Sequence, residues 1–285
     1  MPQGRISFTF NIELLRKDML NIRWSYGHWR WKETTLILTE LSRLGIAMAA
    51  DSAVTIIHDT GEISVRSDAA MKLKKIPYLG AGISCWGEGT ISEMSTDKWL
   101  SRFIHSNSAI TQLGIFAEEL AIQLNKEVTP NARETSLGFH LAGFEDHQGV
   151  PTPSFYHIHD GPSQMLANRG IIVNPNRFNA NPDIPPFLHQ QLASNNKGYL
   201  VRNGDFRLYA MISESLTKLF EELRTEGIVI PHSQNLSDRA EYLIFWIRTM
   251  IELYRLSNLV PGIGGGIHYL TISSGGIQSE GIQHL

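Results

Sequence analysis

The segment TTLILTELSRLGIAMAADSAVT, residues 34–55, carries the pattern around which we interpret the rest of the chain. It reads as two β-strands with alternating apolar side chains, joined by a tight turn at residues 42–45. A hydroxyl residue, Thr35, opens this hairpin and a carboxylate, Asp51, closes it. Because the strands of an antiparallel hairpin fold back on each other, the two ends meet. The segment therefore predicts that Thr35 and Asp51 lie close together in space.

The composition is that of a globular protein with a substantial core. The chain has 285 residues, of which 42% are hydrophobic and 19% charged, and its formal net charge is −3. This charge gives no case for binding nucleic acid or an anionic membrane surface. No apolar run reaches the roughly 18 residues that a membrane span needs. Residues 1–33 lack the apolar stretch of a secretory signal, and the single cysteine suits a reducing compartment. We expect a soluble, cytoplasmic, bacterial protein.

Residues within the opening segment also match a known sequence pattern. Gly45, the run Ala49-Ala50-Asp51-Ser52, and Thr55 have the spacing found near the start of proteasome β-subunits and their HslV-type bacterial relatives. The chain resembles these Ntn-hydrolases, in which the N-terminal residue itself is the nucleophile. The resemblance extends in pattern over residues 34–160 and 198–275, with specific motifs only in the first part.

The resemblance implies a catalytic set. Counting back from Gly45 and Asp51 gives Thr35 as the nucleophile, with its α-amine as base, and Thr34 as the second choice. Asp51 would orient the site. Lys72 would tune the amine electrostatically, with Lys74 as the alternative lysine. The backbone N–H at Gly87, in a glycine-rich turn, would stabilise the oxyanion.

The implied function is a threonine-type endopeptidase that cleaves peptide amide bonds through an acyl-enzyme. A homo-oligomeric ring follows from the resemblance, and an ATPase partner is left open. Two alternatives remain open as well: a catalytically silent ring subunit of the same fold, and an Ntn amidase acting on a small molecule. We expect no cofactor and no metal, and peptide or protein as the substrate.

Residues 1–33 differ in character from the rest of the chain. They hold three of the six tryptophans and carry six basic against three acidic side chains. In an Ntn-hydrolase such a segment is a propeptide whose removal frees the nucleophile's amine; the alternative is an ordinary extension. Active proteasome subunits usually have glycine before the nucleophile, whereas Thr34 precedes Thr35 here.

The order of the remaining elements predicts the fold class. We expect helices over residues 91–104 and 113–124, then a strand pair over 136–146 and 154–158, and a short strand at 198–204. Two amphipathic helices follow over 208–223 and 240–254, the second capped by Ser237-Asp238, and then a strand at 267–272. This order predicts an α+β, four-layer αββα sandwich of the Ntn-hydrolase type for residues 34–285. Residues 161–197, rich in proline and asparagine, read as an inserted loop.

Several other residues could carry chemistry, and each has a simpler interpretation. Cys85 lies in an apolar strand and is expected to be a buried, inert thiol. His157, His159 and Asp160 could suggest a metal, but two histidines at this spacing are usually just exposed. The glycine run 262–266 precedes a strand, so it offers no helix N-terminus to a phosphate. The resemblance also places a serine and an aspartate near the nucleophile. Asn203-Gly204 and Ser257-Asn258 occupy those places and supply no acid.

Overall fold

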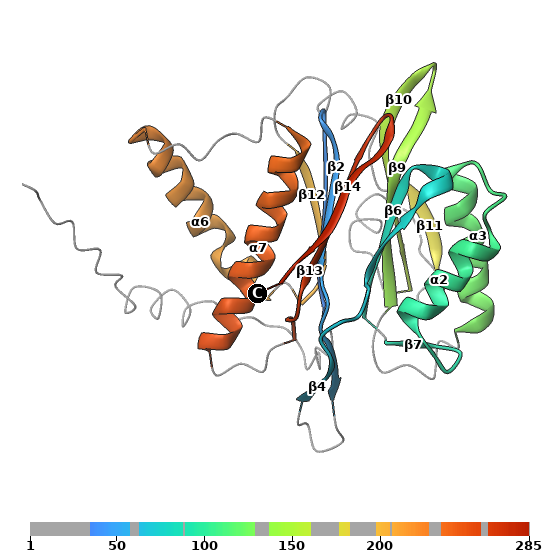
Figure 1. Ribbon diagram of the computed structural model, residues 1–285, viewed down its shortest axis with the longest axis horizontal. Helices are drawn as coiled ribbons and strands as arrows, with labels where there is room; N and C mark the ends of the chain where they lie inside the picture. Colours follow the sequence, from blue (N-terminus) through green and yellow to red (C-terminus); the bar gives the residue numbers. More distant parts are fainter. Residues whose placement is uncertain are drawn as a thin grey trace, which may run out of the picture. The chain divides into compact units, whose positions relative to one another are not determined.

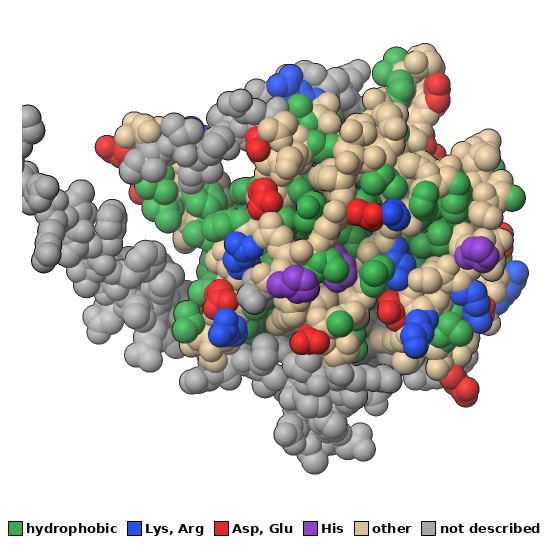
Figure 2. All heavy atoms as spheres, viewed as in Figure 1, with side chains coloured by type: hydrophobic (Ala, Val, Ile, Leu, Met, Phe, Trp, Pro, Cys, Tyr) green, Lys and Arg blue, Asp and Glu red, His purple; other side chains and the backbone are tan. Residues whose placement is uncertain are grey.

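The computed structural model describes residues 35–57, 63–87, 89–128, 137–160, 177–182, 198–205, 207–227, 235–257 and 262–284. These residues form two five-stranded antiparallel sheets and two short hairpins. Helices lie on the outer face of each sheet (Figure 1). The predicted αββα sandwich is confirmed. Figure 2 shows the same side of the molecule, where charged, histidine and apolar side chains are mixed.

The first sheet contains the opening hairpin at its centre. Its strand order is β12-β1-β2-β13-β14. The bounds are Tyr199–Gly204 for β12, Leu36–Ser42 for β1, Gly45–Asp51 for β2, Ile267–Ser273 for β13 and Gly276–Gln283 for β14. The strand pair β1–β2 is in register from Ile37 opposite Ala50 to Ser42 opposite Gly45. The predicted hairpin is therefore present, with its turn at Arg43 and Leu44.

The second sheet has the order β11-β10-β9-β6-β5. The bounds are Asn179–Pro182 for β11, Val150–His159 for β10, Leu137–His147 for β9, Ala81–Gly87 for β6 and Leu73–Ile76 for β5. The short hairpins are β3 (Val54–Ile57) with β4 (Ile63–Ser67), and β7 (Thr90–Ile91) with β8 (Met94–Ser95). Strand β11 lies within the predicted insertion, and most of residues 161–197 lie outside the described residues.

Both strands of the opening hairpin are buried on both faces. Every residue of β1 and β2 is buried. Leu36 and Leu38 pack against the helices of one outer layer, whereas Ile37 and Leu41 pack into the core between the two sheets. A strand buried on both faces needs no polar alternation. This explains why the apolar periodicity of the hairpin sequence is only approximate.

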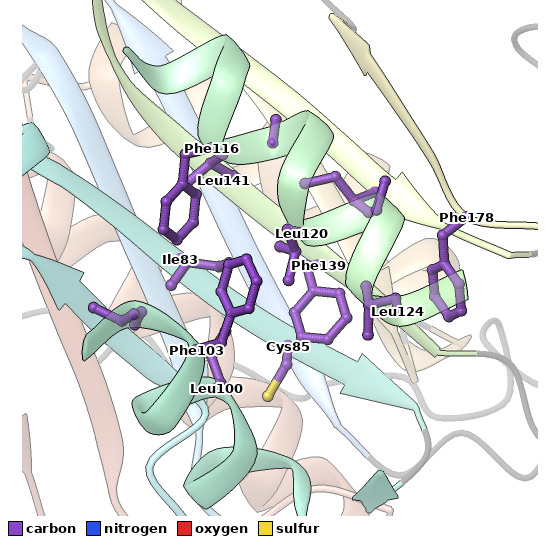
Figure 3. Packing of buried hydrophobic residues seen from close by; sticks show 14 of the residues in the cluster. Ile83, Cys85, Leu100, Phe103, Phe116, Leu120, Leu124, Phe139, Leu141 and Phe178 are labelled. Carbon is purple, nitrogen blue, oxygen red and sulfur yellow. The ribbon is translucent and has the colours of Figure 1, made fainter. Parts of the chain in front are cut away.

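One helical layer covers the second sheet. Helices α2 (Thr96–Ser106) and α3 (Leu113–Glu127) pack aromatic and aliphatic side chains onto β6 and β9. In Figure 3, Phe103 and Phe116 lie beside Ile83 and Leu141, and Phe139 lies near Cys85. Helix α2 begins five residues later than predicted, because residues 90–95 form the β7–β8 hairpin.

The other helical layer covers the first sheet. It consists of α6 (Arg207–Thr225) and α7 (Leu236–Leu256), and α7 contacts β2 and β13. The cap of α7 differs from the prediction. Asn235, rather than Ser237, accepts the backbone N–H of Asp238, whose own carboxylate accepts the N–H of Asn235. Within the described residues, no helix is both long and apolar enough to cross a membrane.

Candidate functional site

Thr35 lies directly before β1, and backbone hydrogen bonds hold it and the next residue, Leu36, in place. The backbone N–H of Asp205 donates to the carbonyl oxygen of Thr35, and the N–H of Leu36 donates to Asp51 Oδ1 at 2.9 Å. Gly204 has a φ of +90°, and a Cβ there would lie 1.7 Å from the carbonyl oxygen of Thr35. A glycine is therefore needed at position 204 for β12 to approach Thr35 this closely.

Lys72 joins the two ends of the hairpin. Its Nζ donates to Thr35 Oγ1 at 2.8 Å and lies 3.2 and 3.3 Å from the two oxygens of Asp51. The side chains of Thr35, Asp51 and Lys72 are all buried. A charge-assisted contact in a buried setting holds its atoms in place more firmly than a solvent-exposed one. The arrangement presents a threonine hydroxyl to an ammonium group whose charge a carboxylate balances.

Asp51 is the most enclosed member of this set, with an exposure of 0%. Its Oδ2 also accepts the backbone N–H groups of Ala53 at 3.2 Å and Gly264 at 3.1 Å. Complete burial raises the pKa of Asp51, although the ammonium of Lys72 and the N–H groups of Leu36 and Gly264 oppose that rise. With three N–H donors and an ammonium around it, the carboxylate has the partners that an ionised form needs.

A cavity of about 240 Å³ opens onto these residues. Thr35, Lys72 and Gly87 line it together with small apolar and hydroxyl-bearing side chains. Gly87 ends β6 with a φ of +89°, a conformation that a side chain would strain. Asp97, from the first turn of α2, also lines the cavity.

The structure thus brings Thr35, Asp51, Lys72 and Gly87 into one site. Lys72 lies directly before the first residue of β5. The alternative lysine, Lys74, lines a different cavity, and Thr34 lies outside the described residues. Cys85 lines the Thr35 cavity, but burial raises the pKa of its thiol to about 11. At neutral pH it therefore holds its proton.

The histidines of β10 are not exposed as expected. His159 is buried and His157 is partly buried, and their rings lie 4.3 Å apart between centroids. The ring of His157 also contacts that of His140 on β9, at 5.2 Å. Asp160 accepts the backbone N–H of Leu137 at 3.0 Å. Over the described ranges, no group of three or more His, Cys, Asp or Glu side chains is arranged to hold a metal ion.

His140 connects the two sheets through neutral partners. Its Nε2 lies 2.7 Å from Asn203 Oδ1 on β12, and its Nδ1 lies 3.0 Å from Thr39 Oγ1 on β1. Since an amide oxygen only accepts, Nε2 carries the proton and Nδ1 accepts from the threonine hydroxyl. Burial lowers the pKa of His140 to about 4, although the bond with Asn203 opposes this. The ring is therefore neutral at physiological pH.

Sequence reasoning missed Asp205. It expected no acid beside the nucleophile near Asn203 and Gly204, yet the next residue is a buried aspartate whose N–H holds Thr35. Its carboxylate accepts the hydroxyl of Tyr254, from α7, at 2.7 Å. The only local signal was the glycine before it, because the contact depends on the pairing of β12 with β1.

Comparisons with known proteins give no family assignment. No protein-family model and no curated protein matches the chain. A solved structure of an Anbu (Gly-1) mutant from Hyphomicrobium sp. strain MC1 is similar at 13% identity and a TM-score of 0.43, covering 88% of this chain and 87% of that one. At this level the likeness carries no conclusion about activity.

The identification of the chain as a member of the proteasome β-subunit and HslV-type family is therefore wrong. Of the residues that suggested it, Gly45, Ala49 and Ala50 are small and apolar and lie in β2, whereas Thr55 lies in the separate strand β3. Small and apolar side chains are also what any strand needs when it is packed between a second sheet and a helical layer. The motif was therefore too short and too generic to identify a family.

Proposed function

We propose that this protein is a hydrolase of peptide amide bonds in which Thr35 is the nucleophile. The observation that carries the proposal is the 2.8 Å contact between Lys72 Nζ and Thr35 Oγ1, backed by Asp51, at the wall of a cavity. A threonine hydroxyl is a weak nucleophile and needs an activating group within hydrogen-bond reach.

The base in this proposal is the α-amine of Thr35. The Nζ of Lys72 already forms an ion pair with the carboxylate of Asp51 and a hydrogen bond with Thr35 Oγ1. Among the described residues that line the cavity there is no histidine. A free α-amine has a pKa of about 8, close to working pH. The proposal therefore requires hydrolysis of the bond between Thr34 and Thr35, by the chain itself or by another protease.

The other residues have supporting roles. Lys72 stabilises negative charge on Thr35 Oγ1 and disfavours protonation of the nearby amine. Asp51 accepts from both the Lys72 ammonium and the N–H of Leu36. It therefore positions Lys72 against Thr35, directly before β1. Gly87 lines the same cavity, and its backbone N–H is the proposed oxyanion donor. The α-amine of Thr35 takes the proton of the hydroxyl as Oγ1 attacks the substrate carbonyl. The α-amine then gives this proton to the amine of the substrate, which leaves as the C–N bond breaks. Water finally hydrolyses the ester between Thr35 and the acyl group, which frees the enzyme.

Hydrolysis of a fluorogenic peptide library by the purified protein tests this proposal. We expect Thr35→Ala to abolish turnover, because it removes the attacking oxygen. Thr34→Ala is the matched control, since it changes the neighbouring threonine and leaves Oγ1 of Thr35 in place. If Thr34→Ala abolishes turnover instead, position 34 supplies the nucleophile.

Unchanged turnover in Thr35→Ala would contradict the proposal. Absence of turnover in the wild-type protein would instead favour the catalytically silent subunit predicted as an alternative. The predicted homo-oligomeric ring and ATPase partner rest on the sequence resemblance and stay predictions.

A further inference from the structure

A second cavity, larger than the first, opens at one edge of the sandwich. Its volume is about 500 Å³. It lies where the edge strand β5 meets β13 and β14, with α2 at one side. Figure 2 shows histidine side chains at the middle of one face of the molecule, with apolar, basic and acidic side chains around them. Pockets of about 300 to 1,000 Å³ are typical for small organic ligands.

The cavity has an apolar floor and an apolar rim. Leu73 and Leu270, from the core between the sheets, form part of its lining and are almost fully buried. Met71 and Ile282 also line it and are 46% and 47% exposed. Binding of an apolar ligand over these exposed side chains would remove apolar surface from water, which is favourable in free energy.

The charged lining of this cavity is mainly basic. Lys74, Lys75 and His268 all contribute. Lys75 is paired with Glu280, also in the lining, so its charge is balanced. Lys74 is partly buried, and in the described part of the chain no carboxylate oxygen lies within salt-bridge distance of its Nζ. A partly buried ammonium without a close anion is a costly arrangement.

The pKa values of Lys74 and His268 are both lowered, so the protein disfavours positive charge on both side chains. Burial lowers the pKa of Lys74, and the more distant Asp97 and Cys85 only oppose this. Burial also lowers the pKa of His268, and the charged groups that add to this effect, Lys74, Lys72 and His284, are all basic. An anion in the cavity would relieve both effects, whereas a cation would strengthen them.

We propose that this cavity binds a small amphipathic carboxylic acid. The carboxylate would pair with Lys74 beside His268, and the hydrocarbon part would cover Leu73, Leu270 and Ile282. The proposal goes beyond the amide hydrolase function and does not rest on it. The site nevertheless adjoins the first one, because Met71 and Leu73 line this cavity while Lys72, between them, lines the Thr35 cavity.

Calorimetric titration of the full chain with three probes of equal chain length tests the proposal. The probes are octanoate, octanol and octylammonium, each below its micelle-forming concentration. We expect octanoate to bind most tightly and octylammonium not to bind. Lys74→Gln should weaken octanoate about tenfold or more, because it removes one charge-assisted bond, and leave octanol unchanged. Lys98→Gln, an exposed lysine of α2 outside the cavity lining, is the matched control.

A second measurement reads the site without relying on a variant. In proton NMR titrations, octanoate should raise the pH midpoint of the His268 ring, and octanol should not. Equal binding of octanoate and octanol, octanoate affinity unchanged in Lys74→Gln, or no binding of octanoate would each overturn the proposal. Peptide turnover that depends on Thr35 without octanoate binding would overturn this inference alone. Octanoate binding without such turnover would contradict the hydrolase proposal alone.

Discussion

Lys72 and Lys74 are two residues apart and show how differently one chain can treat a buried ammonium. Lys72 is 5% exposed and has Thr35 Oγ1 and both oxygens of Asp51 within 3.3 Å. Lys74 is partly buried beside a larger cavity and, within the described residues, has no carboxylate within salt-bridge distance. The first charge is balanced by the protein, whereas we propose that a ligand balances the second.

The difference suggests a general way to read buried charges. A charge that the fold itself neutralises can still form a hydrogen bond with a neighbouring group, which for Lys72 is the hydroxyl of Thr35. A charge that the fold leaves without a close partner marks a place where an anion can bind. The two lysines should therefore respond in opposite directions when their charge is removed.

Removal of the Lys72 ammonium should have the largest effect on stability. We expect Lys72→Met to lower the free energy of unfolding by about 3–5 kcal/mol, because it leaves the Asp51 carboxylate buried without its cation. Urea unfolding measures the change, with Lys98→Met as the exposed control. Adding Asp51→Asn to Lys72→Met should recover part of the loss. A loss below about 1 kcal/mol in Lys72→Met would mean that the pair is not buried as described.

His140, a buried base whose hydrogen-bond partners are neutral, can be compared with the two lysines. His140 stays uncharged in the folded protein because burial lowers its pKa to about 4, whereas an unfolded histidine has a pKa of about 6.5. The unfolded state therefore binds a proton first as pH falls, and stability decreases from pH 6.5 towards pH 4. The loss should reach about 3 kcal/mol at the low end of this range.

Comparison of the wild type with His140→Gln isolates this contribution. Glutamine can bond Asn203 and Thr39 but does not titrate, so the stability of the variant should depend less on pH between 6.5 and 4. Unfolding by urea at several pH values provides the data. Parallel curves for the two proteins would show that His140 is not the buried neutral base described here.

Loss of the hydroxyl partner of Asp205 should destabilise the protein less than loss of the ammonium partner of Asp51. We expect Tyr254→Phe to lower the free energy of unfolding by about 1–2 kcal/mol, because the variant removes the hydroxyl that donates to Asp205. Phenylalanine keeps the ring packing of α7 in place. Thermal unfolding checks the value, and a loss as large as that of Lys72→Met would break the distinction between ionic and hydroxyl partners.

Removal of the Lys74 charge should have the smallest effect and the opposite sign. We expect Lys74→Met to leave stability unchanged or to raise it by less than about 1 kcal/mol, since it removes a partly buried ammonium that lacks a close anion. The same urea series used for Lys72→Met measures it. A clear destabilisation would show that Lys74 has a stabilising partner, and would remove the contrast between the two lysines.

Local patterns predicted the framework of the fold because they are read from consecutive residues. Strand β10 is present but begins at Val150, four residues before the predicted bound of 154. The hairpin of β1 and β2, the helix α3 from Leu113 and the strand β9 lie where periodicity placed them. The beginning of α2 did not, because the short β7–β8 hairpin precedes it and carries no periodic signal. The hairpin also brought Thr35 and Asp51 together as the sequence indicated, with Lys72 between them.

The parts of the site that depend on distant pairing were not accessible from the sequence. Asp205 reaches Thr35 only because β12 pairs with β1, with Gly204 opposite Leu36. Gly264 donates to Asp51 across more than 200 residues of sequence. The cavity at Lys74 forms where β5, β13 and β14 meet from distant parts of the chain. Such contacts are set by register and layer packing, which no local motif encodes.

The most direct test of the central claim is the N-terminus of the purified protein. N-terminal sequencing together with intact mass shows whether the amine of Thr35 is free. We predict a chain that begins at Thr35, since only a free amine can act as the base beside Lys72. A purified protein that hydrolyses peptides while its Thr35 is still joined to Thr34 would contradict the account.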